Sequence, residues 1–416
     1  MDIDCDTKYM KKIKLSLTDK ITIIFACAFF ALCFFVYKTK DNEKFKIDNA
    51  VVKKEEVKAH TINLKKVGFK DLQGFDNENF IEVLPVLIKS CEKIVQSQND
   101  RIVKKIYHDQ ACKALMNISD KSNENIKKVI EKYFEPHLVL NEDKKSFDGT
   151  FTGYYSAELH GSYEKDDVYK YPLYKLPDDL ITVDMSMFTN CTRCTYVARY
   201  DEENKKLVPY FSKSDIENGK MEKAEVLLWV DNPVDALILH IQGSGVVILP
   251  DGNEVKVNYA GNNGHAFIGI GAILKSFDLL EKGKGSMQDV KEWLNNNKEE
   301  AEKLMNINPR YIFFRQAVNN EGPIGSLGVE LTEKRSLAVD NNYIPLGTFI
   351  WLDTVSPDGD KIQNLMSAQD TGIAIKGRIR GDFYFGHGEK AFKDAGRMKS
   401  KGFYYLILPK EKLIKE

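Results

Sequence analysis

Residues 370–386 read DTGIAIKGRIRGDFYFG, and this stretch near the C-terminus carries the main evidence for the fold and its chemistry. Two carboxylates, Asp370 and Asp382, bracket a segment rich in turn-forming and basic residues, within surroundings typical of β-strands. Asp382 is followed by Phe383, Tyr384 and Phe385, in which phenylalanine alternates with tyrosine, and then by Gly386. This pattern predicts that Asp382 lies near the end of a strand and is partly surrounded by aromatic rings. Such burial raises the pKa of a carboxyl group, as a general acid near neutral pH requires.

The same pair of aspartates also has a simpler structural explanation. Aspartates are common in turns, and both carboxylates could pair with the basic residues between them, Lys376, Arg378 and Arg380. Structural ion pairs perturb pKa values as well. The aspartate pair taken alone therefore does not establish a catalytic site.

The composition is that of a globular protein without a general affinity for polyanions. The 416 residues exceed the usual size of one compact core and predict two domains. Lys and Arg number 60 against 61 Asp and Glu, which gives a net charge of -1 and removes a global electrostatic case for nucleic-acid binding. No metal site and no cofactor are predicted, because no motif with suitable ligand spacing stands out.

One segment near the N-terminus has the composition of a membrane helix. Residues 21–37, ITIIFACAFFALCFFVY, carry no charge and are at the short end of what spans a bilayer. They follow a lysine-containing stretch, residues 1–20, which we interpret as a cytoplasmic n-region. The segment is a signal anchor, a cleaved signal peptide or, through Cys27 or Cys33, a lipidation signal. The sequence also leaves open whether translation starts at Met1 or Met10.

Four further cysteines lie beyond this segment, at Cys91, Cys112, Cys191 and Cys194. In an exported protein they could form disulfides, and the last two have the spacing of a redox motif. No second pair, nearby histidine or thioredoxin-like pattern accompanies them, so we favour a local loop disulfide or free thiols.

The chain between the membrane segment and residue 155 divides into a linker and a helical region. Residues 38–70 are rich in Lys and Glu and predict a solvated linker. Apolar residues then recur at helical spacing from Asn79 to about Glu135, and Pro136 ends the pattern. We assign 71–155 to this helical region together with the first part of a barrel domain.

The remainder reads as short strands separated by Gly, Pro and Asp. A hairpin is predicted over Val247–Tyr259, with its turn at Asp251 and Gly252. A helical interlude ends near Pro309. The other predicted strands are Thr152–Tyr155, Tyr169–Tyr174, Val226–Val230, Ala236–Ile241, Tyr311–Phe314, Ser336–Val339, Thr348–Leu352 and Gly402–Leu408. The predicted fold class is therefore mainly β, with two small barrels and an N-terminal helical layer.

Several short motifs, read together and in order, resemble a known family. They are Phe151–Tyr155 with Tyr171–Pro177, Trp229–Asp235 leading to Ile241–Gly245 and Tyr259–His265, Ser286–Gln288 with Trp293 and Asn308–Phe314, and finally Arg335–Asp340, Ile344–Gly347, Ala368–Asp370, Ala374–Gly377 and Asp382. Each is short, but their combined order over residues 150–408 is specific. This region resembles the membrane-bound lytic murein transglycosylase A (MltA) family.

The resemblance implies a fold and a division into domains. Residues 309–416 resemble the three-aspartate (3D) domain, a double-psi β-barrel named for Asp340, Asp370 and Asp382 in this sequence. A second, barrel-like β domain, residues 156–308, would be inserted into it and form one side of a glycan groove. Two departures from the family pattern are Ile373, where a second glycine is usual, and His240, where glutamine is common.

The resemblance also implies an activity, that of a peptidoglycan lytic exotransglycosylase, a glycosidic-bond lyase. Such an enzyme cleaves the β-1,4 bond between N-acetylmuramic acid and N-acetylglucosamine, with the muramyl 6-hydroxyl attacking C1 to form 1,6-anhydromuramic acid. Asp382 would be the general acid and then the base, with Asp370 as a supporting carboxylate. Two alternatives stay open: an inverting hydrolase that uses Asp382 and Asp370 together, and a noncatalytic scaffold that binds peptidoglycan.

The predicted substrate contacts are those expected for a polar glycan, which binds to aromatic rings, amides and hydroxyls. They are Thr152, Gly153, Tyr154, Tyr155, Gln242, Ser244, Gly245, Asp340 and Lys376. Tyrosines in strands usually pack, Gly-Ser-Gly usually forms a turn, and Lys376 or Arg380 could instead hold Asp370 in place. The expected partners are peptidoglycan strands, the membrane through the N-terminal segment, and cell-wall synthesis proteins, with the catalytic body in the periplasm. Endo or exo action, peptide-stem preference and oligomeric state are not determined by the sequence.

Overall fold

The structure is a computed structural model that describes residues 61–97, 102, 105–188, 195–221, 224–281, 283–318 and 321–411, which belong to a compact unit spanning Lys58–Glu416. The predicted membrane segment 21–37 and the pair Cys191 and Cys194 lie outside the described residues. Within the described ranges, no helix is both long and apolar enough to cross a membrane.

A ring of strands forms the centre of the fold. In spatial order it contains β16 (Lys399–Pro409), β13 (Phe349–Val355), β14 (Lys361–Asp370), β12 (Ser336–Val339), β15 (Arg380–His387) and β3 (Gly149–Ser162). Pairing of β16 with β3 closes the ring into a barrel. Two pairs, β12 with β14 and β15 with β3, are parallel, and the others are antiparallel. A closed ring leaves few unpaired sheet edges.

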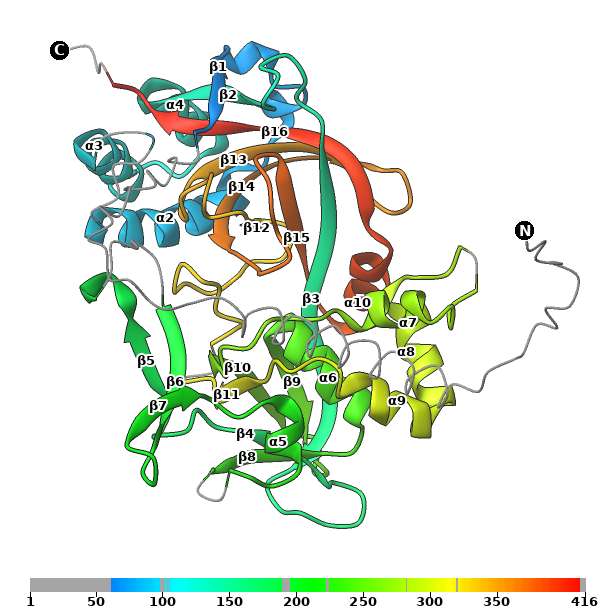
Figure 1. Cartoon of the computed structure of the whole chain (residues 1–416). Coiled ribbons are helices and arrows are strands. Elements are labelled where there is room, and N and C mark those ends of the chain that lie inside the picture. The colour runs from blue at the N-terminus through cyan, green and yellow to red at the C-terminus, as the bar shows by residue number, and fades with distance from the viewer. Residues whose placement is uncertain are drawn as a thin grey trace, which may run out of the picture. The chain divides into compact units, whose positions relative to one another are not determined.

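Strand β3 connects the barrel to the inserted part of the chain, and it runs through both in Figure 1. Its first residues pair with β15, whereas Ala157–His160 pair with β9 (Ser244–Ile248) and Gly161 and Ser162 with β8 (Val226–Val230). The predicted hairpin is confirmed, since β9 pairs antiparallel with β10 (Glu254–Asn262), which in turn pairs with β11 (Ile312–Gln316). The inserted part is thus continuous with the barrel through one strand.

The rest of the inserted part consists of short strands and helices around this sheet. Strand β4 (Tyr171–Tyr174) pairs with β8, and β5 (Ile181–Asp184), β6 (Thr195–Asp201) and β7 (Lys206–Pro209) form a separate sheet. The helices are α5 (Lys213–Glu217), α6 (Pro233–Gln242), α7 (Ile270–Ser276), α8 (Met287–Asn296) and α9 (Lys298–Met305). The predicted helical interlude corresponds to α8 and α9, which Asn297 separates.

One predicted strand is wrong: Ala236–Ile241 lies within helix α6. The Asn232 side chain accepts a hydrogen bond from the backbone N–H of Val234, and Pro233 occupies the first helical turn, so the helix begins with a strong start signal. Residues 236–239 are all buried. A short apolar run buried on every side has no period that separates helix from strand.

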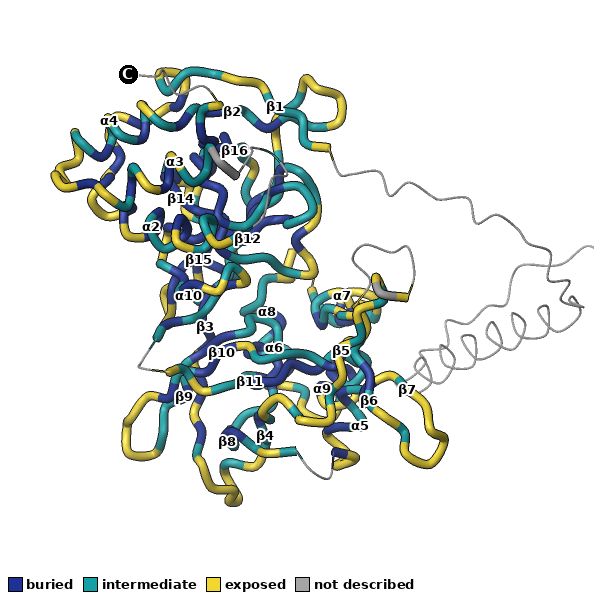
Figure 2. Tube along the Cα trace, turned by 90° about the vertical axis from the view of Figure 1, so that its left-hand side faces the viewer, coloured by how far each residue is buried: buried dark blue, intermediate teal, exposed yellow. Residues whose placement is uncertain are grey.

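A helical layer covers one side of the barrel, as predicted. It contains α2 (Phe80–Gln96), α3 (Lys105–Met116) and α4 (Asn123–Tyr133), and Cys91 of α2 forms a disulfide with Cys112 of α3. Their apolar faces pack with barrel residues such as Trp351 and Ile407 in one buried cluster. Figure 2 shows this buried interior in dark blue beneath the exposed outer turns of the helices.

The folded part begins inside the stretch predicted as linker. Strand β1 (Asn63–Lys66) pairs with β2 (Phe134–Leu140), which pairs with β16, and two 3-10 turns, Phe69–Asp71 and Phe75–Asn77, follow β1. The charged composition of this stretch concealed a strand at the sheet edge, where lysines are favoured because they discourage pairing with other chains.

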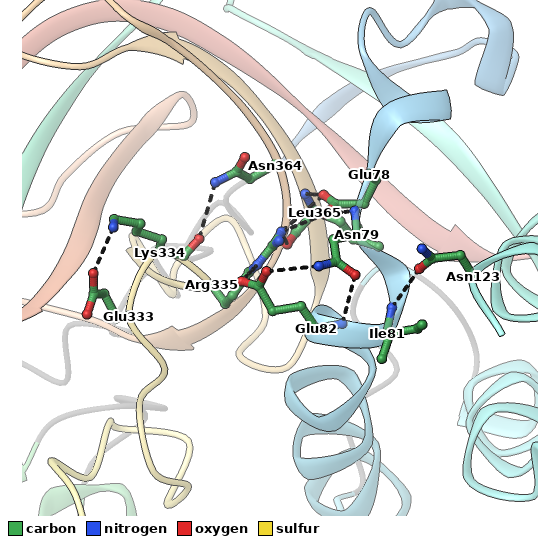
Figure 3. A network of polar contacts seen from close by, with 10 residues as sticks. All are labelled: Glu78, Asn79, Ile81, Glu82, Asn123, Glu333, Lys334, Arg335, Asn364 and Leu365. Atoms are coloured by element: carbon green, nitrogen blue, oxygen red, sulfur yellow. Dashed lines mark hydrogen bonds and ion pairs between the residues drawn. The ribbon is translucent and has the colours of Figure 1, made fainter. Parts of the chain in front are cut away.

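A buried ion pair fastens α2 to the barrel (Figure 3). Arg335, which precedes β12, lies 2.9 Å from the Glu78 carboxylate and 3.0 Å from that of Glu82. Glu78 also accepts a hydrogen bond of 2.6 Å from the backbone N–H of Leu365 in β14. These contacts tie the start of α2 to the two parallel strands β12 and β14, the second of which ends at Asp370.

Candidate active site

The strand register places the two predicted carboxylates on the same face of the barrel. Ala338 in β12 is the partner of Asp370 in β14 and also of Asp382 in β15. Asp382 is in turn the partner of Thr152 in β3. Residues directly opposite on neighbouring strands project to the same side of a sheet, so these four side chains form a row with only a methyl group between the carboxylates.

Asp382 is held through a short polar chain that ends on an arginine. Its Oδ1 accepts a hydrogen bond from the Thr152 hydroxyl, whose oxygen accepts one of 2.7 Å from the Arg380 guanidinium. Burial raises the pKa of Asp382, and the negative charge of Asp370 acts in the same direction. The Thr152 hydrogen bond and the Arg380 charge oppose this rise without cancelling it.

This chain determines which carboxyl oxygen of Asp382 is available for chemistry. A guanidinium only donates, so the Thr152 oxygen must accept from Arg380, and its single proton points to Oδ1 of Asp382. No residue in the described part of the chain donates to Oδ2. A proton on Asp382 therefore belongs on Oδ2.

Asp370 is held more firmly. Its Oδ1 accepts hydrogen bonds from the Ser326 backbone N–H at 2.9 Å, the Ser326 hydroxyl at 2.7 Å and the Thr371 backbone N–H at 2.9 Å. Burial nevertheless raises the pKa of Asp370, against the effect of these donors and of the neighbouring Tyr154 hydroxyl. That hydroxyl is buried beside Asp370 but has no partner in good hydrogen-bond geometry, and its own pKa is raised by burial and by the two carboxylates.

Tyrosines, rather than phenylalanines, form the aromatic surroundings of Asp382. Tyr154 and Tyr384 are register partners on β3 and β15, with ring centroids 5.1 Å apart. Tyr154 lies two residues after Thr152, and Tyr384 lies two residues after Asp382, so both tyrosines project to the same face of the sheet as the carboxylates. Phe383 and Phe385 project to the other face of β15. The aromatic wall was predicted, but its two phenylalanines belong to the core.

Helix α6 and strand β9 bring the inserted part against this site. The Gln242 side chain at the end of α6 accepts a hydrogen bond of 3.2 Å from the Tyr155 backbone N–H. Ser244 in β9 lies 3.4 Å from the hydroxyl of Ser156, which is 2.9 Å from that of Tyr384. Three of the predicted contact residues, Tyr155, Gln242 and Ser244, thus lie next to the strands that carry the carboxylates.

The predicted glycines have structural surroundings. A Cβ atom at Gly153 would lie 2.5 Å from the Phe385 ring and 2.8 Å from the backbone of Ala395 in helix α10 (Gly388–Arg397). At Gly245 it would lie 2.6 Å from the carbonyl oxygen of Ala157. Both positions therefore require glycine for close packing within the protein.

Asp340 and Lys376 are not brought to the row of carboxylates. Asp340 is buried and accepts hydrogen bonds from Asn342 and from the backbone N–H of Gly377, so it pins a turn. Lys376 is exposed and makes no ion pair with either carboxylate within the described ranges. The basic residue beside the site is Arg380, and it contacts Thr152 and not Asp370.

The sequence reasoning missed two residues of this site. Ser326 supplies two hydrogen bonds to a carboxylate 44 positions away, and Ala338 separates the two aspartates. Strand β14, whose last residue is Asp370, was not predicted as a strand either. No local pattern marks Ser326 or Ala338, because the place of each depends on pairing between segments far apart in the sequence.

Family models match most of the described part of the chain. Residues 150–315 match the MltA specific insert domain, and residues 335–408 match the 3D domain. A membrane-bound lytic murein transglycosylase A of Vibrio cholerae is 29% identical over 262 residues, which are 61% of this chain and 63% of that protein. The match thus spans less than two thirds of that relative.

Solved structures extend the similarity to 84% of the chain. The crystal structure of MltA from Neisseria gonorrhoeae superposes with a TM-score of 0.72 at 28% identity, covering 84% of this chain and 93% of that one. A lytic transglycosylase of Burkholderia pseudomallei is 32% identical, with a TM-score of 0.55, and covers 84% of this chain and 96% of that one. With both family models matched in order and the fold shared, this chain belongs to the membrane-bound lytic murein transglycosylase A family.

Proposed function

We propose that this protein is a peptidoglycan lytic transglycosylase with Asp382 as its single acid and base. The observation that carries the proposal is the asymmetry of Asp382, whose Oδ1 is occupied by Thr152 while Oδ2 has no donor among the described residues. A half-buried carboxyl group with a raised pKa and one oxygen without a donor can hold a proton and present it to a bound sugar.

Two proton transfers through the same oxygen complete the reaction. First, Oδ2–H of Asp382 protonates the oxygen that leaves with N-acetylglucosamine, and the bond from that oxygen to C1 of N-acetylmuramic acid breaks. The carboxylate then removes the proton from the muramyl 6-hydroxyl as its oxygen bonds to C1. Asp382 ends protonated, no water is consumed, and the product is 1,6-anhydromuramic acid.

The two-carboxylate hydrolase is less well supported by the geometry. Two strand spacings separate Asp370 from Asp382, about 9–10 Å between their Cα atoms, and carboxylate pairs of inverting enzymes span a similar range, so spacing alone does not decide. The two carboxyl groups differ in how they are held: Oδ1 of Asp370 accepts three hydrogen bonds, and Tyr154 flanks this carboxyl group. Three donors on one oxygen fix the orientation of the Asp370 carboxyl group, so we assign it a supporting role beside Asp382, and the products of the digest below distinguish this role from that of a base.

The glycan would lie against the row of carboxylates, in a groove between two domains. One is the barrel, which consists of residues 309–416 and a strand from the region 71–155, and the other is the inserted domain, residues 156–308. Tyr154 offers an aromatic ring beside both acids, and Gln242 and Ser244 offer amide and hydroxyl groups from the inserted side. Because the substrate is in the cell wall, we place the catalytic body in the periplasm, attached to the membrane through residues 21–37. Cell-wall synthesis proteins are the partners we propose there.

The test is the mass of the products from purified peptidoglycan. The wild-type protein should release muropeptides lighter by one water than reducing-end products. Asp382→Asn should lower product formation by about 10²–10⁴-fold or more, because the amide keeps the shape but cannot donate and recover the proton. Asp370→Asn should retain measurable activity.

Each alternative gives a different result in the same digest. Reducing-end products from the wild type would establish the hydrolase instead. Glycan binding without any product would establish the scaffold. Full activity of Asp382→Asn would refute the assignment of the acid.

A further inference from the structure

A large cavity lies inside the inserted part, and neither Asp382 nor Asp370 lines it. Its volume is about 1010 Å³, and its walls come from α6, α8, α9, α5 and β4, which Figure 1 shows grouped below the barrel. None of the residues proposed for catalysis or glycan contact lines it. Pockets for small ligands have volumes up to about this size, so the space can hold more than solvent.

His240 gives this cavity a hydrogen-bond donor of known orientation. Its Nδ1 accepts a hydrogen bond of 3.2 Å from the Ile312 backbone N–H, so a neutral ring must carry its proton on Nε2. The ring is neutral because burial and the Lys213 charge lower its pKa to about 3. No acceptor for Nε2 exists among the described residues, and His240 lines the cavity.

Lys213 is a deeply buried charge in the wall of the cavity, and it is already neutralised. Lys213 is 5% exposed, and its ammonium group contacts the Glu217 carboxylate and the Asn306 side-chain oxygen, the latter at 3.1 Å. A bound anion would have to compete with Glu217 for this ammonium group. The lysine therefore does not make the cavity an anion site.

The remaining lining disfavours anions and suits an uncharged, hydroxyl-rich ligand. Besides Lys213 and Glu217, the cavity is lined by four carboxylates and two lysines: Asp167, Asp231, Glu299, Glu302, Lys170 and Lys298. The net charge of this lining is therefore negative. The rings of Tyr171 and Tyr311 and the amides of Asn232 and Asn295 line it as well. The two amides are bonded to each other, and Asn232 also accepts from the Val234 N–H, so the carboxylates are the main acceptors for sugar hydroxyls, while aromatic rings pack against the apolar faces of the sugar.

We propose that this cavity is a second glycan-binding site, which takes an uncharged N-acetylhexosamine oligosaccharide. Nε2 of His240 donates to the ligand, the carboxylates accept from its hydroxyls, and Tyr171 supplies an apolar wall. The choice of glycan as ligand rests on the proposed function, since the enzyme acts on polymeric strands that extend beyond one site. Helix α6 separates the two sites, with His240 facing the cavity and Gln242 bonded beside the catalytic strands.

Calorimetric titration of the full-length protein with chitotetraose tests the proposal. The protein should carry Asp382→Asn so that the probe is not cleaved. We expect two binding sites, and His240→Leu in this background should weaken one of them at least tenfold. His240→Gln should restore binding, because glutamine can both accept from Ile312 and donate into the cavity.

A second pair of variants guards against a folding defect in His240→Leu. Glu299 and Glu302 are exposed, so Glu299→Ala with Glu302→Ala should weaken the same site without lowering the melting temperature. Lys361→Ala, at an exposed position in the barrel, is the matched control and should change neither site. A single site that none of the cavity variants weakens would overturn the proposal, as would preferential binding of tetralysine or of tetragalacturonate in the cavity.

Failure of this proposal and failure of the proposed function are distinguishable. His240→Leu in the otherwise wild-type protein should form anhydro products from soluble glycan fragments within about twofold of the wild-type rate, because the cavity holds no proposed catalytic group. Products without a second site would overturn only the inference about the cavity. A second site without any product would overturn only the proposed activity.

Discussion

The surroundings of Asp382 would suit a general acid, but they lower the stability of the folded protein. Its neighbourhood favours the protonated carboxyl group, and the same burial makes the ionised form unfavourable in the folded protein. The folded state therefore binds the proton more tightly than the unfolded state does. Stability then falls as pH rises from the ordinary pKa of aspartate, about 3.9, through the higher folded pKa, and it stays reduced above that value.

Asp382→Asn should consequently raise the melting temperature at pH 7. The amide carries no charge to be desolvated and can still accept from Thr152. Below about pH 3.5, where aspartate is protonated in both states, the advantage should vanish. Thermal unfolding followed from pH 3 to pH 8 measures this. Asp340→Asn is the control and should lower the melting temperature, since its carboxylate accepts from Asn342 and Gly377.

Arg380 should set the pH dependence of activity through Asp382. The guanidinium charge lowers the pKa of Asp382, so Arg380→Gln should raise it further and shift the alkaline limb of kcat/KM to higher pH. Glutamine can still donate to Thr152, which keeps the hydroxyl oriented. Arg378→Gln, which removes a pairing with Glu142, should leave the profile unchanged. An unshifted alkaline limb in Arg380→Gln would contradict this electrostatic role.

Among the secondary-structure elements, helix α2 is linked to the strand that carries Asp370 without contributing a residue to the candidate site. The start of α2 is tied to β14 and β12 by Glu78 and Arg335. Further along the helix, the Ser90 hydroxyl is hydrogen-bonded to that of Ser367 and accepts a hydrogen bond from Gln369, the residue before Asp370. Gln369 is fully buried and also donates to the carbonyl of Val86. The helical layer thus fixes the back of the strand that ends at Asp370.

Arg335→Met should destabilise the protein strongly. It leaves the Glu78 side chain, 3% exposed, as a buried charge without its partner, which typically costs about 3–5 kcal/mol. The double variant Glu78→Gln with Arg335→Met should be more stable than Arg335→Met alone, because glutamine is uncharged and can still accept from Leu365. Chemical denaturation of the three proteins gives the comparison. Equal loss in the single and double variants would show that packing, and not the unpaired charge, dominates.

The disulfide between α2 and α3 should stabilise this layer by a measurable amount. Cys91 and Cys112 are 21 residues apart in sequence, and a loop of this length predicts roughly 3 kcal/mol from restriction of the unfolded chain. Cys91→Ser with Cys112→Ser should lower the free energy of unfolding by up to that amount. A reducing agent should destabilise the wild type but leave the double variant unchanged. If the reductant affects both proteins alike, another disulfide is responsible.

At the scale of the whole molecule, the location of the catalytic body is the main prediction. Residues 21–37 lie outside the described residues, and their uncharged composition predicts a segment that directs the rest of the chain across the membrane. Alkaline phosphatase, active only outside the cytoplasm, should be active when fused after Glu416. Deletion of 21–37 should abolish that activity. A fusion reporter that works only in the cytoplasm, if active at the same position, would place the body on the other side.

Much of this architecture was predictable because its signals are local. The helical layer followed from apolar spacing between Asn79 and Glu135, and the β9–β10 hairpin from Asp251 and Gly252. The order of short motifs predicted the family and singled out Asp382. Each of these signals rests on residues within a few positions of one another, where backbone preferences act before any tertiary contact forms.

The tertiary structure alone decided which residues surround each carboxylate. Thr152 meets Asp382 across 230 positions and Ser326 meets Asp370 across 44, and neither pairing leaves a trace in local periodicity. Local sequence was also insufficient for Ala236–Ile241, where burial on all sides left no apolar periodicity to distinguish a helix from a strand. For Asp340, the family motif did not indicate that its carboxylate accepts hydrogen bonds within a turn. Sequence by itself determined most of the elements and singled out Asp382 as the candidate acid, whereas strand pairing between distant segments decided which oxygen of Asp382 is left without a donor among the described residues, because register is a property of two segments together.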